Sequence, residues 1–351
     1  MRALATRKEA RGRGQTSGKA LAAGLLGALV AVGSAVLWAQ QPSPPPGQAP
    51  VFRVKVDLVV LSVSVTNRQG RYVTGLKPGD FRVLEDGISQ KIAFFGEGSQ
   101  APVTVEGERA AAGADVSGPA GAAGIDLASD SFVGTNVFIL FDTSNFMYRG
   151  FVYAEDAIAD FLRGLDRADS IAIYTFSRNL SRATPPTRDR MLALRGLRQS
   201  VAGDDTALYN ALLLTLRDGA RMPGRKVVIV FSNGPDNASM LAPDDVRAVA
   251  EDEGIPIYVI STSEVNKDPI SGNVFRRITA RTGGKAYFAK TWQRQTEAFH
   301  AIREELGHVY TVSYYPQPNP NEGWRSITVE LNGDAARKHR IRTRAGYRPK
   351  L

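Results

Sequence analysis

The chain has 351 residues, of which 43% are hydrophobic and 23% are charged, a composition typical of a globular protein. Its length exceeds what one ordinary core holds, so more than one domain is expected. The chain has no cysteine, which excludes a disulfide-stapled module, a thiol nucleophile and cysteine metal ligands.

The formal net charge of +9 is unevenly distributed along the chain. The residues before position 20 include six cations and one anion, so this segment contributes +5 and the rest of the chain +4. After it, no tract dense in lysine and arginine with interleaved aromatic residues follows. The charge pattern therefore argues against a nucleic-acid partner.

Residues 1–40 have the features of an export signal. The basic start is followed by an uncharged apolar run from Ala20 to Trp38 (ALAAGLLGALVAVGSAVLW). Cleavage after Ala39 would place Leu37 at a position that favours a small residue, and the run is long enough to span a bilayer. A cleaved signal peptide and an uncleaved membrane anchor over residues 20–38 therefore remain alternatives. In both, the chain after residue 40 is extracytoplasmic: periplasmic or secreted, or anchored to the inner membrane.

The next segments are a tether and a set of short strands. Residues 41–50 (QPSPPPGQAP) are rich in proline and predict a stiff, extended tether. Residues 51–98 contain alternating apolar runs separated by turn signals such as Asp86-Gly87. Short strands with regular turns predict the first part of a β-sandwich. Residues 99–134 are rich in glycine and alanine, without an apolar period, and predict a flexible linker.

From residue 135 to residue 307 strands alternate with helices. Continuous apolar runs such as 137–141 and 227–231 predict strands buried on both faces, and apolar residues spaced by three and four predict helices between them. The expected strands are 137–141, 171–176, 227–231, 257–260 and 286–288; the expected helices include 208–216, 246–253 and 298–306. This alternation predicts a doubly wound, mostly parallel α/β sheet with helices on both sides.

Residues 308–351 return to strand character. Three strands are expected, around 310–315, 327–331 and 341–344, and three strands cannot bury a good core alone. Their natural partners are the strands of 51–98. We therefore expect one β-sandwich formed by the N- and C-terminal strands, with the α/β domain inserted into it.

The α/β segment resembles the von Willebrand factor type A (VWA) domain. Three places carry the resemblance: the strand end at Asp142-Thr143-Ser144, the segment TALYNAL starting at Thr206, and VVIVFSNGPDN, which contains Asn233. The family's metal-ion-dependent adhesion site uses a D-x-S-x-S loop, a distant threonine and a distant aspartate. The flanking strands also resemble a bacterial family of exported VWA-related proteins, through the stretch from Val73 to Gly87.

The resemblance implies a metal site that departs from the family pattern. Asp142, Ser144 and Thr206 match the first carboxylate, the first serine and the threonine. Phe146 replaces the second serine and has no oxygen to offer, and Asn233 replaces the second acid, so that it could act only through its amide oxygen or a bound water. No cofactor is therefore certain, and binding of Mg²⁺ or Mn²⁺ is expected to be weak.

Two interpretations of this site remain open. In one, Asp204 or Asp205 compensates for the lost charge and a cation binds weakly. In the other, the pocket is metal-free, with Asp142 held by helix N-terminal amides and Ser144 acting as an N-cap. Asp236 and Asn237 are expected to form a turn.

The sequence does not predict an enzyme. The three histidines, His300, His308 and His339, neighbour no nucleophile in the pattern, and no nucleophile elbow, zinc-protease motif or P-loop is present. The resemblance implies instead a non-catalytic, adhesion-type module that binds a protein partner at the top of the VWA sheet. The alternative is a structural envelope component or an assembly factor that acts through the β-sandwich.

Overall fold

The computed structural model describes residues 58–105, 134–166, 169–263, 268–333 and 338–349. All of them belong to one compact unit, Val56–Leu351. The expected leader (1–40), the tether (41–50) and most of the expected linker lie outside the described residues. Within the described ranges, no helix has both the length and the apolar character that a bilayer span needs.

Two antiparallel sheets form the β-sandwich. The first has the order β14-β1-β12-β4-β5 and the second β15-β13-β2-β3. The strands of the first sheet are β1 (Val59–Asn67), β4 (Ile92–Glu97), β5 (Val103–Thr104), β12 (Tyr310–Tyr314) and β14 (His339–Arg342). Those of the second are β2 (Phe81–Glu85), β3 (Ile88–Gln90), β13 (Arg325–Leu331) and β15 (Gly346–Tyr347).

The two ends of the chain share this sandwich, as expected from the sequence. Strand β12 lies between β1 and β4, with Leu61 opposite Val312, and β13 pairs with β2, with Val83 opposite Val329. The alternating apolar residues of all these strands meet in one buried cluster. Neither end supplies both halves of this core, because each sheet needs strands from both.

The short strand β5 lies inside the range that was expected to be linker. It pairs with β4, with Phe95 opposite Val103. Its two residues are exposed, which explains why no apolar pattern marks it. The domain bounds derived from the sequence, 51–98, 99–134, 135–307 and 308–351, remain predictions.

The stretch from Val73 to Gly87 has a structural role in the sandwich. Asp86 and Gly87 both have positive φ, 47° and 81°, and form the two-residue turn between β2 and β3. The Asp86 carboxylate accepts hydrogen bonds from Ser326 N (2.7 Å) and from the side chains of Asn319 and Asn321. The turn is thereby attached to the C-terminal strands.

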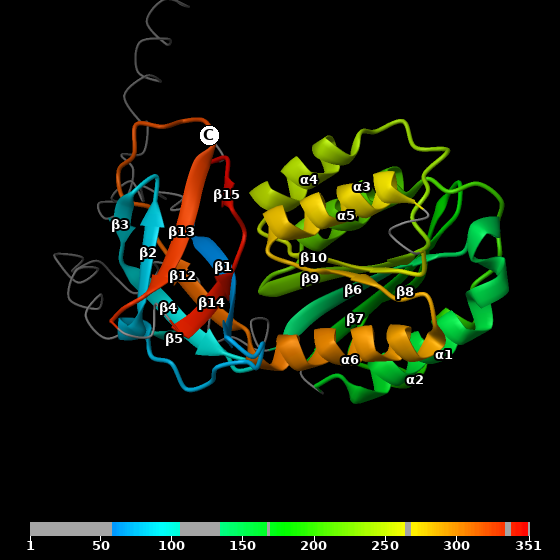
Figure 1. The fold of residues 1–351 in the computed structure, drawn as a ribbon, viewed down its shortest axis with the longest axis horizontal. Coiled ribbons are helices and arrows are strands. Elements are labelled where there is room, and N and C mark those ends of the chain that lie inside the picture. The colour runs from blue at the N-terminus through cyan, green and yellow to red at the C-terminus, as the bar shows by residue number, and fades with distance from the viewer. Residues whose placement is uncertain (1–57, 106–133, 167–168, 264–267, 334–337, 350–351) are drawn as a thin grey trace, which may run out of the picture. The chain divides into compact units, whose positions relative to one another are not determined.

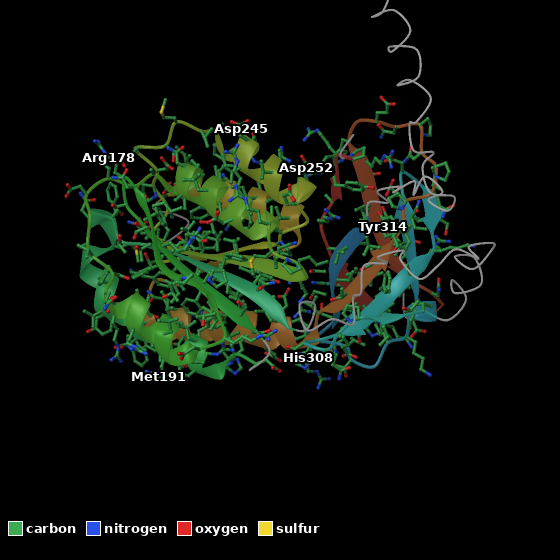
Figure 2. All side chains as sticks on the ribbon, turned by 180° about the vertical axis from the view of Figure 1, so that it is seen from behind. Arg178, Met191, Asp245, Asp252, His308 and Tyr314 are labelled. Carbon is green, nitrogen blue, oxygen red and sulfur yellow. The ribbon has the colours of Figure 1, made fainter. Side chains whose placement is uncertain are left out.

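Glu85 precedes this turn and is fully buried. Its carboxylate accepts hydrogen bonds from Tyr314 Oη (2.8 Å), Tyr347 Oη (3.0 Å) and Arg325 Nη1 (2.9 Å); Tyr314 is labelled in Figure 2. Buried charges need such complete pairing, because an unpaired one is costly to desolvate. Glu85 therefore joins the N-terminal strand to the C-terminal strands from inside the core.

Glu85→Ala is expected to destabilise the sandwich by about 3 kcal/mol, because it leaves Arg325 and two tyrosine hydroxyls buried without their acceptor. Glu330→Ala is the matched control on the neighbouring strand, since its ion pair with Arg82 is exposed (43% and 55%) and should contribute less than about 1 kcal/mol. Urea unfolding of the purified chain measures both changes. Equal losses in the two variants would contradict this role of Glu85.

The inserted domain is built on a six-stranded sheet of order β11-β10-β9-β6-β7-β8. Its strands are β6 (Thr135–Asp142), β7 (Ser170–Phe176), β8 (Leu180–Thr187), β9 (Arg225–Ser232), β10 (Ile257–Ser261) and β11 (Ala286–Phe288). A short 3-10 helix, η3 (Asn145–Gly150), follows β6. The α-helices are α1 (Phe151–Gly164), α2 (Arg190–Arg198), α3 (Leu208–Ala220), α4 (Pro243–Asp252), α5 (Pro269–Thr282) and α6 (Trp292–His308).

The helices cover both faces of this sheet (Figure 1). Helices α1, α2 and α6 pack on one face around Ile139 and Ile229, and α3, α4 and α5 pack on the other around Leu140 and Val230. Successive strand residues point to opposite faces, so the continuous apolar runs of β6 and β9 feed both cores. The expected doubly wound α/β sheet is confirmed.

One edge of the sheet departs from the parallel pattern. Strand β8 runs antiparallel to β7, and both β8 and α2 were missed from the sequence. Strand β8 (LSRATPPT) is largely polar and contains Pro185 and Pro186, which an edge strand tolerates because one side of its backbone has no ladder partner. The sheet is therefore mixed, with five parallel strands and one antiparallel edge.

Buried charged residues connect the inserted domain to the sandwich. Arg225, at the start of β9, donates to Thr135 Oγ1 (2.8 Å), Leu306 O (2.9 Å) and Gly98 O (2.9 Å). Glu305 on α6 accepts from Tyr258 Oη (2.6 Å) and Tyr72 Oη (3.1 Å) and pairs with Arg342 on β14. These bonds fasten α6 and β9 to strands from both ends of the chain.

Candidate functional site

The candidate site lies where the strand order of the sheet reverses. From β6 the chain proceeds through α1 to β7 on one side, and from β9 it proceeds through α4 to β10 on the other. Asp142 is the last residue of β6 and Ser232 the last residue of β9, and the two strands are parallel neighbours. The carboxyl ends of strands at such a switch point form the usual ligand crevice of an open α/β sheet.

Asp142 is fully buried at this position. Its Oδ2 accepts a hydrogen bond from Ser232 Oγ (2.6 Å), and its Oδ1 accepts one from Ser144 N (2.9 Å). Burial raises the pKa of Asp142 above its ordinary value, although the hydrogen bonds from Ser232 and Ser144 oppose this and Asp236 adds to it. Sequence reasoning missed Ser232, whose only signal was its position at the end of an apolar strand.

Three further oxygen atoms at the site are buried without a hydrogen-bond partner. They are Ser144 Oγ, Thr206 Oγ1 and Asn233 Oδ1. Ser144 and Thr206 are almost completely buried, at 1% and 0% exposure. Unpaired buried polar atoms are rare and costly, and a missing ion or water is a common reason for them.

Backbone hydrogen bonds bring the three loops together. Asn145 N donates to Asp204 O (3.0 Å) and Gly203 N donates to Thr143 O (2.8 Å), which joins the loop after β6 to the loop before α3. Asn237 N donates to Thr206 O (3.1 Å), which joins the latter to the loop after β9. The structure thus brings together the residues that the sequence separates by some ninety positions.

The replaced positions are also at the site. Phe146 is 46% exposed, and its carbonyl oxygen accepts a hydrogen bond from Asn233 Nδ2 (3.3 Å). This bond uses the amide nitrogen of Asn233, and its amide oxygen is buried without a hydrogen-bond partner among the described residues. The ring of Phe146 itself supplies no polar atom.

Asp204 and Asp205 are the two acids that could compensate for the lost charge, and the structure places one in an ion pair and the other in solvent. Asp205 pairs with Arg178 (2.6 Å) and accepts a hydrogen bond from Asn237 Nδ2 (3.2 Å); Figure 2 shows Arg178 on the surface. Asp204 is exposed. Asp205 therefore already has a cationic partner.

Asp236 and Asn237 were expected to form a turn; they lie in the loop after β9, with a bend at Asn237, and their side chains support the site. Asp236 accepts from Ser239 N (2.8 Å) within its own loop and from Tyr209 N (3.0 Å) at the start of α3. Asn237 Oδ1 accepts from Thr206 N (2.8 Å). These side chains hold the threonine loop against the loop after β9, a role for which the sequence carried no specific signal.

The structure revises one part of the metal-free interpretation. Ser144 is the N-cap residue of η3, but its side chain makes no capping hydrogen bond. Asp142 is held by one backbone amide and one hydroxyl, and no row of helix amides surrounds it. The hydroxyl of Ser144 therefore does not act as the cap of η3.

The oxygen set suits a hard cation, although it is short of charge. Hydroxyl, amide and carboxylate oxygens are the ligands that Mg²⁺ takes in proteins. In the described part of the chain, however, no cluster of three or more histidine, cysteine, aspartate or glutamate residues could hold a metal. Asp142 is the one carboxylate among the matched residues, and weak cation binding stays a prediction.

Asp142 is expected to destabilise the metal-free fold at neutral pH. A carboxyl whose folded pKa is raised adds stability below its unfolded pKa, and this contribution is lost as the pH rises through the folded pKa. In chelator, Asp142→Asn should therefore raise the melting temperature at pH 7, and the difference from the natural chain should shrink towards pH 4. A lower melting temperature for Asp142→Asn at pH 7 would contradict the raised pKa.

One comparison, with models of known protein families, agrees with this architecture. Residues 136–301 match the family model of the von Willebrand factor type A domain. This part of the chain is a VWA domain, as the resemblance predicted, and the chain carries it within a β-sandwich.

Several solved structures are similar to part of this chain at low sequence identity. BatB from Bacteroides thetaiotaomicron is 19% identical, covers 49% of this chain and 97% of its own, and has a TM-score of 0.42. The von Willebrand factor domain of the type V pili tip protein Mfa5 from Porphyromonas gingivalis is 11% identical, with coverages of 49% and 95% and a TM-score of 0.43. A von Willebrand factor type A protein from Catenulispora acidiphila is 12% identical, with coverages of 62% and 68% and a TM-score of 0.40.

Two curated proteins match the sequence, and both are quinone-dependent dihydroorotate dehydrogenases. The protein from Rhizobium rhizogenes is 24% identical over 233 residues, which is 66% of this chain and 52% of that protein. The protein from Rhizobium leguminosarum bv. trifolii is 27% identical over 155 residues, which is 44% of this chain and 39% of that protein. The chain thus spans about half or less of the length of these relatives.

Proposed function

We propose that the chain is a non-catalytic, extracytoplasmic binding module that engages a protein partner at the switch-point edge of its VWA sheet. The observation that carries the proposal is the group of buried, unpartnered oxygens of Ser144, Thr206 and Asn233 beside the buried carboxylate of Asp142. Unpaired buried polar atoms lower the stability of the fold, and such a loss of stability is typical of binding sites.

Asp142, Ser144 and Thr206 would hold a weakly bound Mg²⁺ or Mn²⁺, with Asn233 contributing through its amide oxygen or a water. The ion would supply positive charge at this edge, so that a carboxylate of the partner could complete its coordination. Beside it, the exposed side chain of Phe146, whose carbonyl oxygen accepts a hydrogen bond from Asn233, offers apolar contact area.

Affinity capture tests the proposal. The purified chain and its Asp142→Ala variant are immobilised, and partners are collected from envelope extract with and without chelator. We expect partners that need both Asp142 and the divalent cation. Partners retained equally by the variant and in chelator would overturn the proposed site and favour the alternative, a structural component or assembly factor that acts through the β-sandwich.

The absence of catalysis is part of the proposal and is tested separately. His300 is exposed on α6, His308 stacks on Tyr72 with ring centroids 5.5 Å apart, and His339 lies on β14. None of these elements carries a residue of the candidate site. The curated relatives are named quinone-dependent dihydroorotate dehydrogenases, so the oxidation of dihydroorotate by a quinone is the reaction to assay. Turnover by the purified chain would refute the non-catalytic role.

The extracytoplasmic location rests on the leader sequence. A reporter fused after residue 60 should be active outside the cytoplasm, because the apolar run from Ala20 to Trp38 directs export. Retention in the membrane after a carbonate wash would favour the uncleaved anchor, and release would favour a cleaved signal. Activity of the reporter only in the cytoplasm would contradict export.

A further inference from the structure

A fourth unpartnered oxygen lies on a loop at the same edge of the sheet. Among the described residues, Asp268 has the one carboxylate oxygen, Oδ2, that is both buried and without a hydrogen-bond partner. Asp268 precedes α5, the helix that follows β10, and β10 is the parallel neighbour of β9. The carboxyl ends of β6, β9 and β10 meet at one edge, so Asp268 belongs to the same side of the domain as Asp142.

Asp268 is positioned by its own helix. Its Oδ1 accepts a hydrogen bond from Ser271 N (3.0 Å), as an N-cap residue does. This bond orients the carboxylate and leaves Oδ2 without a partner. A carboxylate oxygen that is buried and unpaired is costly unless a cation or a bound water meets it.

The free oxygen of Asp268 lies against the loop that carries Asn233. Gly234, the next residue, has a φ of +121°, and a Cβ built on it would lie 3.3 Å from Asp268 Oδ2. A side chain at this position would be crowded by the carboxylate and by Ser271 Cβ (3.1 Å), in a backbone conformation that favours glycine. The glycine permits the close approach of Asp268 to the Asn233 loop.

The charge of Asp268 also reaches the threonine loop. Tyr209 lies in the first turn of α3, three residues after Thr206. Burial, followed by the charges of Asp236 and Asp268, raises the pKa of Tyr209 to about 12. Arg277 opposes this shift, and Asp268 is close enough to the start of α3 for its charge to act on Tyr209.

Given the proposed cation site, on which this inference rests, we propose that Asp268 supplies the second negative charge that Asn233 no longer provides. Asp205 is neutralised by Arg178, and Asp204 is exposed to solvent, so neither offers a free buried charge. Asp268 acts on the cation through space or through a bound water, as a charge-balancing residue. Asp268 lies outside the family's motif, so no pattern in the sequence indicated this role.

Titration of the purified chain with Mn²⁺ tests the assignment. Isothermal calorimetry measures the binding, and electron paramagnetic resonance measures the Mn²⁺ that stays free. Asp268→Asn keeps the N-cap of α5 and removes the charge. We expect it to weaken Mn²⁺ binding roughly tenfold, the order of effect of one partly screened charge on a divalent ion. Asp204→Asn and Asp205→Asn are the matched controls and should change the affinity less than about twofold.

The outcomes separate this inference from the proposed function. If the natural chain binds Mn²⁺, Asp142→Asn abolishes binding and Asp268→Asn changes it less than about twofold, the cation site stands and the role of Asp268 is overturned. Equal losses in Asp205→Asn and Asp268→Asn also overturn it. If the natural chain does not bind Mn²⁺ but the variant with Asn233→Asp does, the loops form the site and Asp268 does not compensate. If neither binds, the cation site itself falls, and this inference with it.

Discussion

Replacing Phe146 by serine and Asn233 by aspartate together should make the VWA domain strongly responsive to Mg²⁺. The double change restores one oxygen ligand and one negative charge at the site. Ser144 and Thr206 already have hydroxyl oxygens without a hydrogen-bond partner there, and Asp142 has a carboxylate that accepts from Ser232 and Ser144. At a ligand concentration one hundred times its dissociation constant, binding stabilises the folded state by about 2.7 kcal/mol. The natural chain should shift little in millimolar Mg²⁺, because its site has fewer ligands and less charge.

Melting curves of the natural chain and the double variant, in chelator and in Mg²⁺, measure this difference. Phe146→Ala with Asn233→Gln is a matched control, since it removes the ring and alters the amide without adding a ligand or a charge. Failure of the double variant to respond would mean that the three loops do not form an adhesion site. A large shift in the natural chain that disappears in Asp142→Ala would show that binding is stronger than we expect.

Deleting residues 310–351 should unfold the N-terminal strands. Strand β12 lies between β1 and β4, and β13 lies between β15 and β2, so the deletion removes a central strand from each sheet. The remaining strands would lack half of the shared core, and such fragments are not stable in water. Residues 135–307 should keep their structure, because the VWA sheet and both of its helical layers lie within this range.

Hydrogen exchange and limited proteolysis of the truncated chain measure the two parts separately. We expect loss of protection in 58–105 and retained protection in the VWA strands. The complementary fragment 51–134 should show no cooperative melting transition. A stable 51–134 fragment that unfolds cooperatively would contradict the shared sandwich. Unfolding of the VWA strands in the truncated chain would show that the VWA domain needs the hydrogen bonds that Arg225 and Glu305 make to the sandwich.

Local patterns in the sequence were sufficient for most of the fold. The apolar runs of β6 and β9 and the three- and four-residue spacing of the helices predicted a doubly wound sheet, because strand and helix periods are properties of short segments. The alternating strands at both ends predicted a shared sandwich, because neither set had enough strands for its own core. Strand β8 and helix α2 were missed, since an edge strand with Pro185 and Pro186 has neither a strong apolar pattern nor full ladder pairing.

The sequence by itself also determined which residues could form the site, since Asp142, Ser144, Thr206 and Asn233 follow the family's order along the chain. Only the tertiary structure decided how their neighbours act on them. In the folded chain Asp205 forms an ion pair with Arg178, Ser232 donates a hydrogen bond to the carboxylate of Asp142, and Asp268 lies close to Gly234. Such contacts join loops that follow different strands, and their geometry depends on how the sheet and its helices pack. A periodic pattern describes one segment at a time, so it carries no information about which charges the packing brings together.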